Sequence, residues 1–166
     1  MSAYPHEVAP QDLETLAGQL GRPARGVVAI GARCVCGRPT VVRTAPRLDD
    51  GTPFPTTFYL THPGAVAATS TLEASGVMRE MSERLAADED LAARYRAAHE
   101  HYLASRAELG EPEEIAGISA GGMPTRVKCL HVLVAHALAA GPGVNPLGDE
   151  ALALISGTWR PDVCTC

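Results

Sequence analysis

The segment that most constrains the fold is residues 125–140, TRVKCLHVLVAHALAA, the most hydrophobic stretch of the chain. Its apolar residues recur at helical spacing on two faces rather than one. A helix that is apolar on two faces is usually central and buried. The run Gly141-Pro142-Gly143 then ends the helical pattern. We therefore expect a buried helix here, with the rest of the chain packed around it.

A small sheet is predicted before this helix. Residues 26–33 and 40–44 are apolar and β-branched and flank a short turn, which is typical of a hairpin. Gly37 supplies the conformational freedom that a tight turn needs. Residues 56–60 predict a third strand, and Thr61 is the expected N-cap of the helix that follows it.

Helical spacing, capping residues and helix breakers predict the remaining helices. They cover residues 11–20, 64–75, 77–86, 89–109 and 149–155. With one Trp, four Tyr and two Phe, the core must be built from Ala, Leu and Val, which suits closely packed helices. The expected class is α+β, helix-dominated, with a small antiparallel sheet of about three strands packed by four or five helices. A length of 166 residues fits a single domain, residues 1–166, with a core of about 11–156 and a C-terminal tail of 157–166.

Charge and hydropathy exclude several classes of function. The net charge is −5 and no basic stripe occurs, so we expect no nucleic-acid partner. No run of 18 apolar residues occurs, and the first residues lack a signal-peptide pattern, so we expect no membrane partner and a cytoplasmic location. Thiols are kept reduced in that compartment, and five cysteines is an odd number. A disulfide framework is therefore not expected, and the cysteines need another explanation.

Two short cysteine motifs suggest a metal site that binds zinc or, as the alternative, an iron–sulfur cluster. Cys34 and Cys36 lie in the hairpin turn, where two thiolates can face one ion, and Cys129-x-His131 adds a thiol and an imidazole. The predicted ligands are Cys34, Cys36, Cys129 and His131, provided that Cys129 lies at a frayed first helical turn. The alternative ligands are His62, His136, Cys164 and Cys166. Simpler roles stay open for these four: His62 as a capping residue, His136 as a hydrogen-bonded core residue, and the terminal cysteines in a mobile tail.

Other chemistry is also open. Cys129 lies near a helix start beside Arg126 and Lys128, which would lower its pKa and make it a reactive thiol, although no base is identified. A set of basic residues near the Gly121-Gly122 pair predicts an anion-binding site. That set is Arg38, Arg47, Arg126 and Lys128. A metal-free protein-interaction module, using the acidic surface and the proline-rich loop 46–55, is a further alternative. No catalytic residue and no oligomeric state follow from the sequence.

Long motifs over about residues 20–156 resemble a known family, the domain of unknown function 501. The stretches that carry the resemblance are Cys36-Gly37-x-Pro39, Thr44-x-Pro46-Arg47-Leu48-x-x-Gly51-Thr52-Pro53-Phe54-Pro55-Thr56, Tyr59-Leu60-Thr61, Leu72-Glu73-x-x-Gly76-x-Met78, Gly121-Gly122-Met123, Arg126-Val127-Lys128-Cys129-Leu130-His131 and Asn145-Pro146-Leu147-Gly148. The resemblance implies an uncharacterised bacterial, actinobacterial protein of the cytoplasm, and it assigns no catalytic residue. Under the separate alternative of a metal-free interaction module, the expected protein partner acts in cell division or envelope growth. Cys164 and Cys166 lie outside these stretches.

Overall fold

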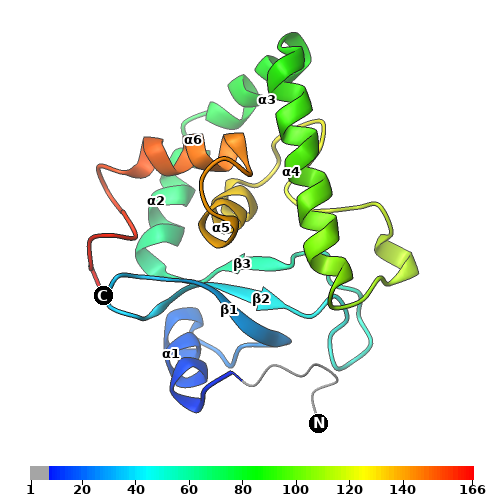
Figure 1. Ribbon diagram of the computed structural model, residues 1–166. Coiled ribbons are helices and arrows are strands. Elements are labelled where there is room, and N and C mark those ends of the chain that lie inside the picture. The colour runs from blue at the N-terminus through cyan, green and yellow to red at the C-terminus, as the bar shows by residue number, and fades with distance from the viewer. Residues whose placement is uncertain (1–7) are drawn as a thin grey trace.

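A computed structural model describes residues 8–166 of the chain (Figure 1). Three strands and six α-helices follow one another along this part, with one short 3-10 helix between α4 and α5. They are α1 (Pro10–Leu20), β1 (Val27–Arg33), β2 (Pro39–Thr44), β3 (Phe58–Leu60), α2 (Pro63–Glu73), α3 (Val77–Ala87), α4 (Glu89–Ala107), η1 (Glu113–Ile115), α5 (Leu130–Ala140) and α6 (Pro146–Ile155). The predicted helix-dominated α+β class is confirmed, and the described residues form six α-helices where four or five were expected.

The sheet is antiparallel with strand order β1-β2-β3, so the hairpin and the third strand follow the prediction. Val42 of β2 lies between Ile30 of β1 and Tyr59 of β3. Figure 1 shows α1 on one side of this sheet and the other helices on the opposite side. Because only that second side is covered by several helices, the main core lies between the sheet and α5.

The central position predicted for the most hydrophobic helix is confirmed. Leu130, Leu133 and Val134 of α5 are fully buried in the core cluster. Helix α6 packs closely against α5 at Gly148, where an added Cβ would lie 2.9 Å from the Cβ of Ala137 and in collision with the carbonyl of Leu133. A side chain at position 148 would therefore separate two core helices.

The start of α5 differs from the prediction. The helix begins at Leu130 rather than at residue 125, and Cys129 is its extended N-cap. The backbone before it turns tightly at Gly122, whose φ is +93° and whose absent Cβ lets Arg126 O and Lys128 N approach. Lys128 N–H donates to Gly121 O at 2.7 Å, which fixes this turn. Apolar periodicity could not reveal a turn made by backbone contacts.

The start of α2 also differs, since its N-cap is His62 and not Thr61. The side chain of His62 accepts hydrogen bonds from the N–H groups of Gly64 and Ala65, as a capping side chain does. Thr61 is buried and pairs through its backbone N–H with Thr40 O at 2.9 Å, so it still belongs to the sheet. This shift of one residue brings a histidine to the end of α2 nearest the hairpin turn.

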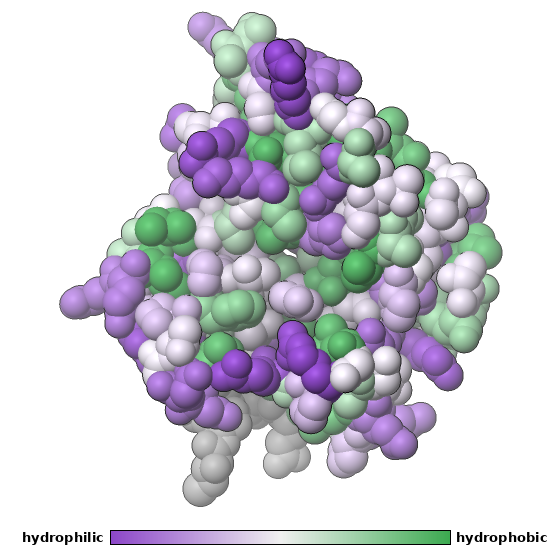
Figure 2. Space-filling model, turned by 180° about the vertical axis from the view of Figure 1, so that it is seen from behind, coloured by the Kyte–Doolittle hydropathy of each residue, from purple (hydrophilic) through white to green (hydrophobic). Residues whose placement is uncertain are grey.

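Two surface observations bear on partners. None of the helices described within residues 8–166 combines the length and the apolar character needed to cross a membrane. On the face shown in Figure 2, apolar residues lie in separate groups among polar ones. That face therefore presents no broad continuous apolar patch of the kind that marks a large interface.

Candidate metal centres

The turn between β1 and β2 presents two thiols. Gly37 N–H donates to Cys34 O, and Cys34 N–H donates to Arg38 O, both at 2.8 Å. Gly37 has a φ of +92°, which the sequence anticipates for this tight turn. Cys34 is buried and Cys36 is exposed, so the turn carries one thiol inside the fold and one that solvent can reach.

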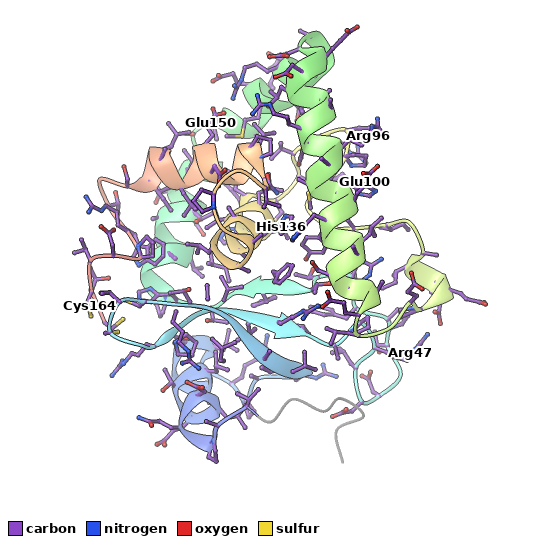
Figure 3. The ribbon with its side chains drawn as sticks, viewed as in Figure 1. Arg47, Arg96, Glu100, His136, Glu150 and Cys164 are labelled. Carbon is purple, nitrogen blue, oxygen red and sulfur yellow. The ribbon has the colours of Figure 1, made fainter. Side chains whose placement is uncertain are left out.

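The C-terminal segment returns to this turn. After α6, Trp159 is buried and its ring lies 5.4 Å from that of His62, centroid to centroid. Val35 N–H then donates to Pro161 O at 3.0 Å, which ties the segment to the hairpin. Figure 3 shows Cys164 beside the turn between β1 and β2. The terminal cysteines therefore have a defined place on the fold.

Four cysteines meet at this point. The Sγ atoms of Cys34, Cys36, Cys164 and Cys166 all lie within 4.8 Å of one another, and those of Cys36 and Cys166 are 3.4 Å apart. A tetrahedral zinc ion bound at about 2.3 Å by four thiolates separates neighbouring sulfurs by about 3.8 Å. In the cluster of these four residues, called here the four-cysteine cluster, the sulfurs are near enough to one another to share one such ion.

The thiols of the four-cysteine cluster influence one another. A hydrogen bond from the backbone of Arg38, and then the neighbouring thiols, lower the pKa of Cys36 to about 7. Burial, and then the same neighbours, raise the pKa of Cys166 to about 12. The directions are opposite because hydrogen bonds from neighbouring groups stabilise a first thiolate, at Cys36, and a second negative charge beside it is then disfavoured. A cation among them would allow all four to be deprotonated.

His62 holds Cys166 from outside the four-cysteine cluster. Its Nδ1 accepts from the N–H groups of Gly64 and Ala65, at 3.0 and 3.4 Å, so the ring proton must be on Nε2. Nε2 lies 3.1 Å from Cys166 Sγ and donates to it. Burial lowers the pKa of His62, which keeps the ring neutral. Both ring nitrogens of His62 therefore have partners, and its Nε2 faces the sulfur of Cys166, so the capping role that the sequence left open for His62 is the one observed.

A second group of potential ligands comprises Glu73, Cys129 and His131, called here the Cys-His-Glu cluster. His131 Nδ1 lies 2.5 Å from Glu73 Oε1 and 4.0 Å from Cys129 Sγ. His131 Nε2 lies 3.3 Å from Val66 O and 3.1 Å from Ser70 Oγ. Residues 66, 70 and 73 share one face of α2, and this face meets the start of α5.

His131 interacts favourably with both of its neighbours in the Cys-His-Glu cluster. The interaction with Cys129, opposed by burial and aided by Glu73, raises the pKa of His131 to about 9. Burial would raise the pKa of Cys129, but hydrogen bonds from His131 and from the Val132 backbone outweigh it and lower the pKa. The pKa of Cys129 is therefore below its ordinary value, and the neighbour responsible is His131 rather than Arg126 or Lys128.

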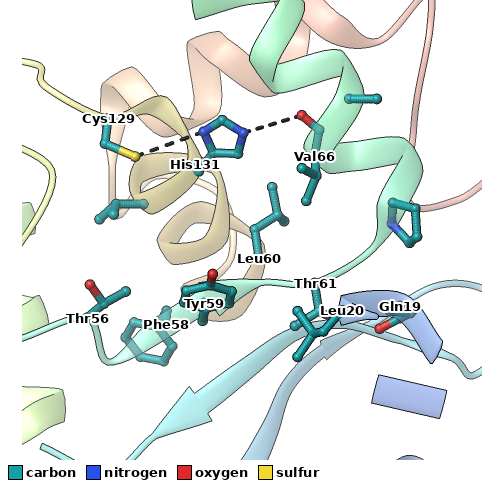
Figure 4. A pocket seen from close by; sticks show the side chains of 13 residues that line it. Gln19, Leu20, Thr56, Phe58, Tyr59, Leu60, Thr61, Val66, Cys129 and His131 are labelled. Atoms are coloured by element: carbon teal, nitrogen blue, oxygen red, sulfur yellow. Dashed lines mark hydrogen bonds between the residues drawn. The ribbon is translucent and has the colours of Figure 1, made fainter. Parts of the chain in front are cut away.

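A cavity of about 690 Å³ adjoins the Cys-His-Glu cluster (Figure 4). Cys129 and His131 form part of its wall, and the rest comes from α1, α2, α5 and the segment that contains β3. The other lining residues are Gln19, Leu20, Thr56, Phe58, Tyr59, Leu60, Thr61, Pro63, Val66, Ala67 and Val132. Most of this wall is apolar, so the polar ligands lie at one side of a largely hydrophobic space.

The predicted ligand set is divided between the two clusters. Cys34 and Cys36 lie with the tail cysteines, which the sequence analysis gave only as alternatives, whereas Cys129 and His131 lie with Glu73. Glu73 is a residue that sequence reasoning missed as a ligand, because its contact with His131 joins residues 58 apart. The only sequence signal for Glu73 was its place in one of the family-like stretches.

His136, another alternative ligand, belongs to a buried network. Asn145 Oδ1 accepts from Gly148 N–H, so its amide nitrogen faces His136 Nδ1, at 3.2 Å. His136 Nε2 then donates to His101 Nδ1 at 2.9 Å. Burial, and then His101, lower the pKa of His136 to about 4. This is the hydrogen-bonded core role, and Figure 3 shows His136 in the interior between α4 and α5.

The four basic residues of the predicted anion site have separate surroundings. Arg47 pairs with Glu114 at 2.8 Å, and Arg38 borders a second cavity together with His62 and Cys166. Arg126 O accepts from the Tyr95 hydroxyl at 3.0 Å, and the backbone of Lys128 closes the Gly121 turn. These contacts place Arg126 and Lys128 in a structural turn.

The fold and the cysteine cluster define a helix-dominated α+β protein with a candidate metal centre. A family model described as "Protein of unknown function (DUF501)" matches residues 30–153. The chain therefore belongs to the DUF501 family, as the resemblance predicted. No curated protein and no solved structure was found to match it. The matched region contains the whole Cys-His-Glu cluster but only Cys34 and Cys36 of the four-cysteine cluster.

Proposed function

We propose that the chain is a metal-binding domain in which Cys34, Cys36, Cys164 and Cys166 hold one zinc ion. The observation that carries this proposal is the approach of four thiols within 4.8 Å from two segments distant in sequence. Cys36 and Cys166 are 130 residues apart. Four protein ligands would close the coordination sphere, which is the pattern of a structural rather than a catalytic zinc site.

Zinc is favoured over an iron–sulfur cluster by the spacing of the sulfurs. An iron–sulfur cluster places several iron and sulfide ions between its cysteines and spreads them farther apart than one ion does. Sulfurs that all lie within 4.8 Å of one another, with Cys36 and Cys166 3.4 Å apart, suit a single ion. The His62 N–H directed at Cys166 Sγ supplies the outer hydrogen bond that usually orients a ligand. A cytoplasmic location, which keeps thiols reduced, suits such a site.

The proposed role of the ion is to fasten the C-terminal segment to the hairpin. Apart from the thiols, the contacts that hold that segment after Trp159 include Val35 N–H to Pro161 O and His62 Nε2–H to Cys166 Sγ. Because the ligands are assembled by folding, the binding free energy of the ion adds to the stability of the folded state.

The test is metal analysis combined with cobalt substitution. Purified protein should contain zinc, and the Co²⁺ form should show the intense charge-transfer absorption of four thiolates. Cys36→Ser should abolish that absorption, whereas Cys129→Ser, outside the four-cysteine cluster, should keep it. Folded protein with five titratable thiols and no tetrathiolate signal after Co²⁺ addition would refute the proposal. Bound iron with sulfide-to-iron absorption would assign the cluster to the iron–sulfur alternative instead.

A further inference from the structure

The geometry points to a second metal site, in which Glu73, Cys129 and His131 bind a divalent, zinc-like cation and leave one coordination position facing the adjoining cavity. A thiolate, an imidazole and a carboxylate are all zinc ligands. Their donor atoms lie within 4.8 Å of one another at the meeting of α2 and α5. This site is distinct from the four-cysteine cluster in its residues and in its place on the fold.

The orientation of His131 carries this inference. Val66 O can only accept a hydrogen bond, so Nε2, 3.3 Å away, carries a proton and donates it. The Nδ1 atom is thereby directed at both Glu73 and Cys129. A metal-binding histidine characteristically donates its second ring N–H to a backbone carbonyl in this way. A proton and a metal ion are then alternatives at Nδ1, between the same two anionic neighbours.

The distances require only small movements. Ligands bound tetrahedrally at about 2.0–2.3 Å are separated by about 3.3–3.8 Å. The Nδ1–Oε1 distance of 2.5 Å would lengthen and the Nδ1–Sγ distance of 4.0 Å would shorten, each by less than about 1 Å. Glu73 is the last residue of α2 and Cys129 is the N-cap of α5, and both lie at the partly exposed ends of helices. Side chains at such positions can move without disturbing the core.

The cavity defines what the open position could receive. Three protein ligands with a fourth position for water or substrate is the catalytic zinc pattern. Here that position would face the largely apolar cavity lined by Leu20, Tyr59 and Val132 (Figure 4). The ligand class that fits is a small molecule with an apolar body and an oxygen-bearing head group, such as a carboxylate, that can bind the metal.

The two proposed sites lie at the two ends of α2. His62, beside the four-cysteine cluster, is the N-cap of this 11-residue helix, and Glu73 is its last residue. At 1.5 Å per residue, the helix separates the two by about 16 Å. Each site can therefore be removed by substitution without changing the ligands of the other, and a failure of one proposal is distinguishable from a failure of the other.

The test compares variants of each site after loading with Zn²⁺ or Co²⁺. Wild-type protein should bind two equivalents of zinc. Glu73→Gln and Cys129→Ser should each bind one and retain the tetrathiolate cobalt absorption. Cys36→Ser should also bind one, with a weaker cobalt spectrum from a single thiolate. Added azide should shift that remaining spectrum, because it can enter an open position, whereas a closed site would not respond.

Two results would overturn this second site. One is a wild-type stoichiometry that Glu73→Gln and Cys129→Ser both leave unchanged. The other is fast alkylation of Cys129 at neutral pH that excess Zn²⁺ does not slow, which would show a metal-free thiolate paired with His131. Glu73→Gln changes a partly exposed helix end, so a circular dichroism spectrum matching that of wild type establishes that any loss of metal is not a loss of fold.

Discussion

His62 Nε2 lies 3.1 Å from Cys166 Sγ, while the Nδ1 atom of the same ring caps α2. One side chain thus joins a helix start to a segment 104 residues later. Because the two nitrogens have separate partners, the two functions of His62 can be separated by substitution.

The first prediction separates them with two variants. His62→Asn retains an oxygen that can cap α2 but loses the N–H directed at Cys166, whereas His62→Ala loses both. Both variants should weaken metal binding at the four-cysteine cluster by about 10- to 100-fold, measured by competition with a chromophoric chelator. Only His62→Ala should also lose about 1 kcal/mol of unfolding free energy in the presence of chelator. Equal metal affinity of wild type and both variants would show that His62 acts only as a cap.

The second prediction concerns Tyr102, whose buried hydroxyl oxygen accepts from the N–H groups of Thr57, at 2.8 Å, and Phe58, at 3.2 Å. Tyr102→Phe would leave two buried donors without this partner, and we expect a loss of about 2–3 kcal/mol in urea unfolding. Tyr95→Phe is the comparison, since it removes one hydrogen bond to Arg126 O. A carbonyl tolerates such a loss better than an N–H does, so its effect should be smaller. Equal losses of stability in the two variants would contradict the conclusion that Tyr102 satisfies two buried N–H groups at the start of β3.

The third prediction is a pH dependence that arises from His136. Its pKa of about 4 in the folded protein lies below the ordinary value of 6.5, so the unfolded chain binds the proton more readily. The contribution of His136 to the free energy of unfolding should be fully present above about pH 6.5. It should fall by about 3 kcal/mol in all as the pH decreases toward 4. The groups facing it are His101, which lowers the pKa of His136 further, and the rings of Phe58 and Tyr102, which carry no charge.

The measurement is the unfolding free energy at pH 7.5 and pH 5, with chelator present in every sample. His136→Gln is the control, because it removes the titrating group and leaves other acid effects in place. Its stability at pH 7.5 should be lower than that of wild type, and the difference between the two proteins should shrink at pH 5. A constant difference would show that His136 does not titrate in this range.

The fourth prediction tests the contact of α5 with α6. Gly148→Ala places a methyl group against Ala137 and the carbonyl of Leu133, and we expect a loss of about 3 kcal/mol or more. Gly18→Ala in α1 is the matched control, since its Cβ would meet no atom within 4 Å. That control should be neutral or stabilise the protein by up to about 1 kcal/mol, following helix propensity. Similar thermal unfolding of the two variants would contradict the close packing at Gly148.

Local patterns in the sequence were sufficient to predict the elements and the central helix. The two apolar faces of α5 required a buried position, and the β-branched runs around Gly37 required a hairpin, because both follow from near neighbours along the chain. The start of α5 was misplaced because the turn at Gly122 depends on backbone atoms of Arg126 and Lys128. The sequence does not display such contacts as a periodic pattern.

The grouping of ligands was beyond sequence reasoning. Cys34 and Cys129 are both plausible ligands, and nothing local says that one faces Cys166 and the other faces Glu73. That choice depends on the direction of α2, which carries His62 to one cluster and Glu73 to the other. Long-range packing therefore decides which thiols lie together, although the residue types alone identify the cysteines as candidate metal ligands.

The return of the C-terminal segment to the hairpin turn has a mechanical consequence. Cys36 and Cys166 are in contact although 130 residues separate them, so a bound ion would close almost the whole chain into a ring. A force applied to the chain outside that ring would load the metal–thiolate bonds and leave the helices inside unstretched. Rupture of those bonds, followed by unfolding of the enclosed core, would then release on the order of 450 Å of hidden contour length.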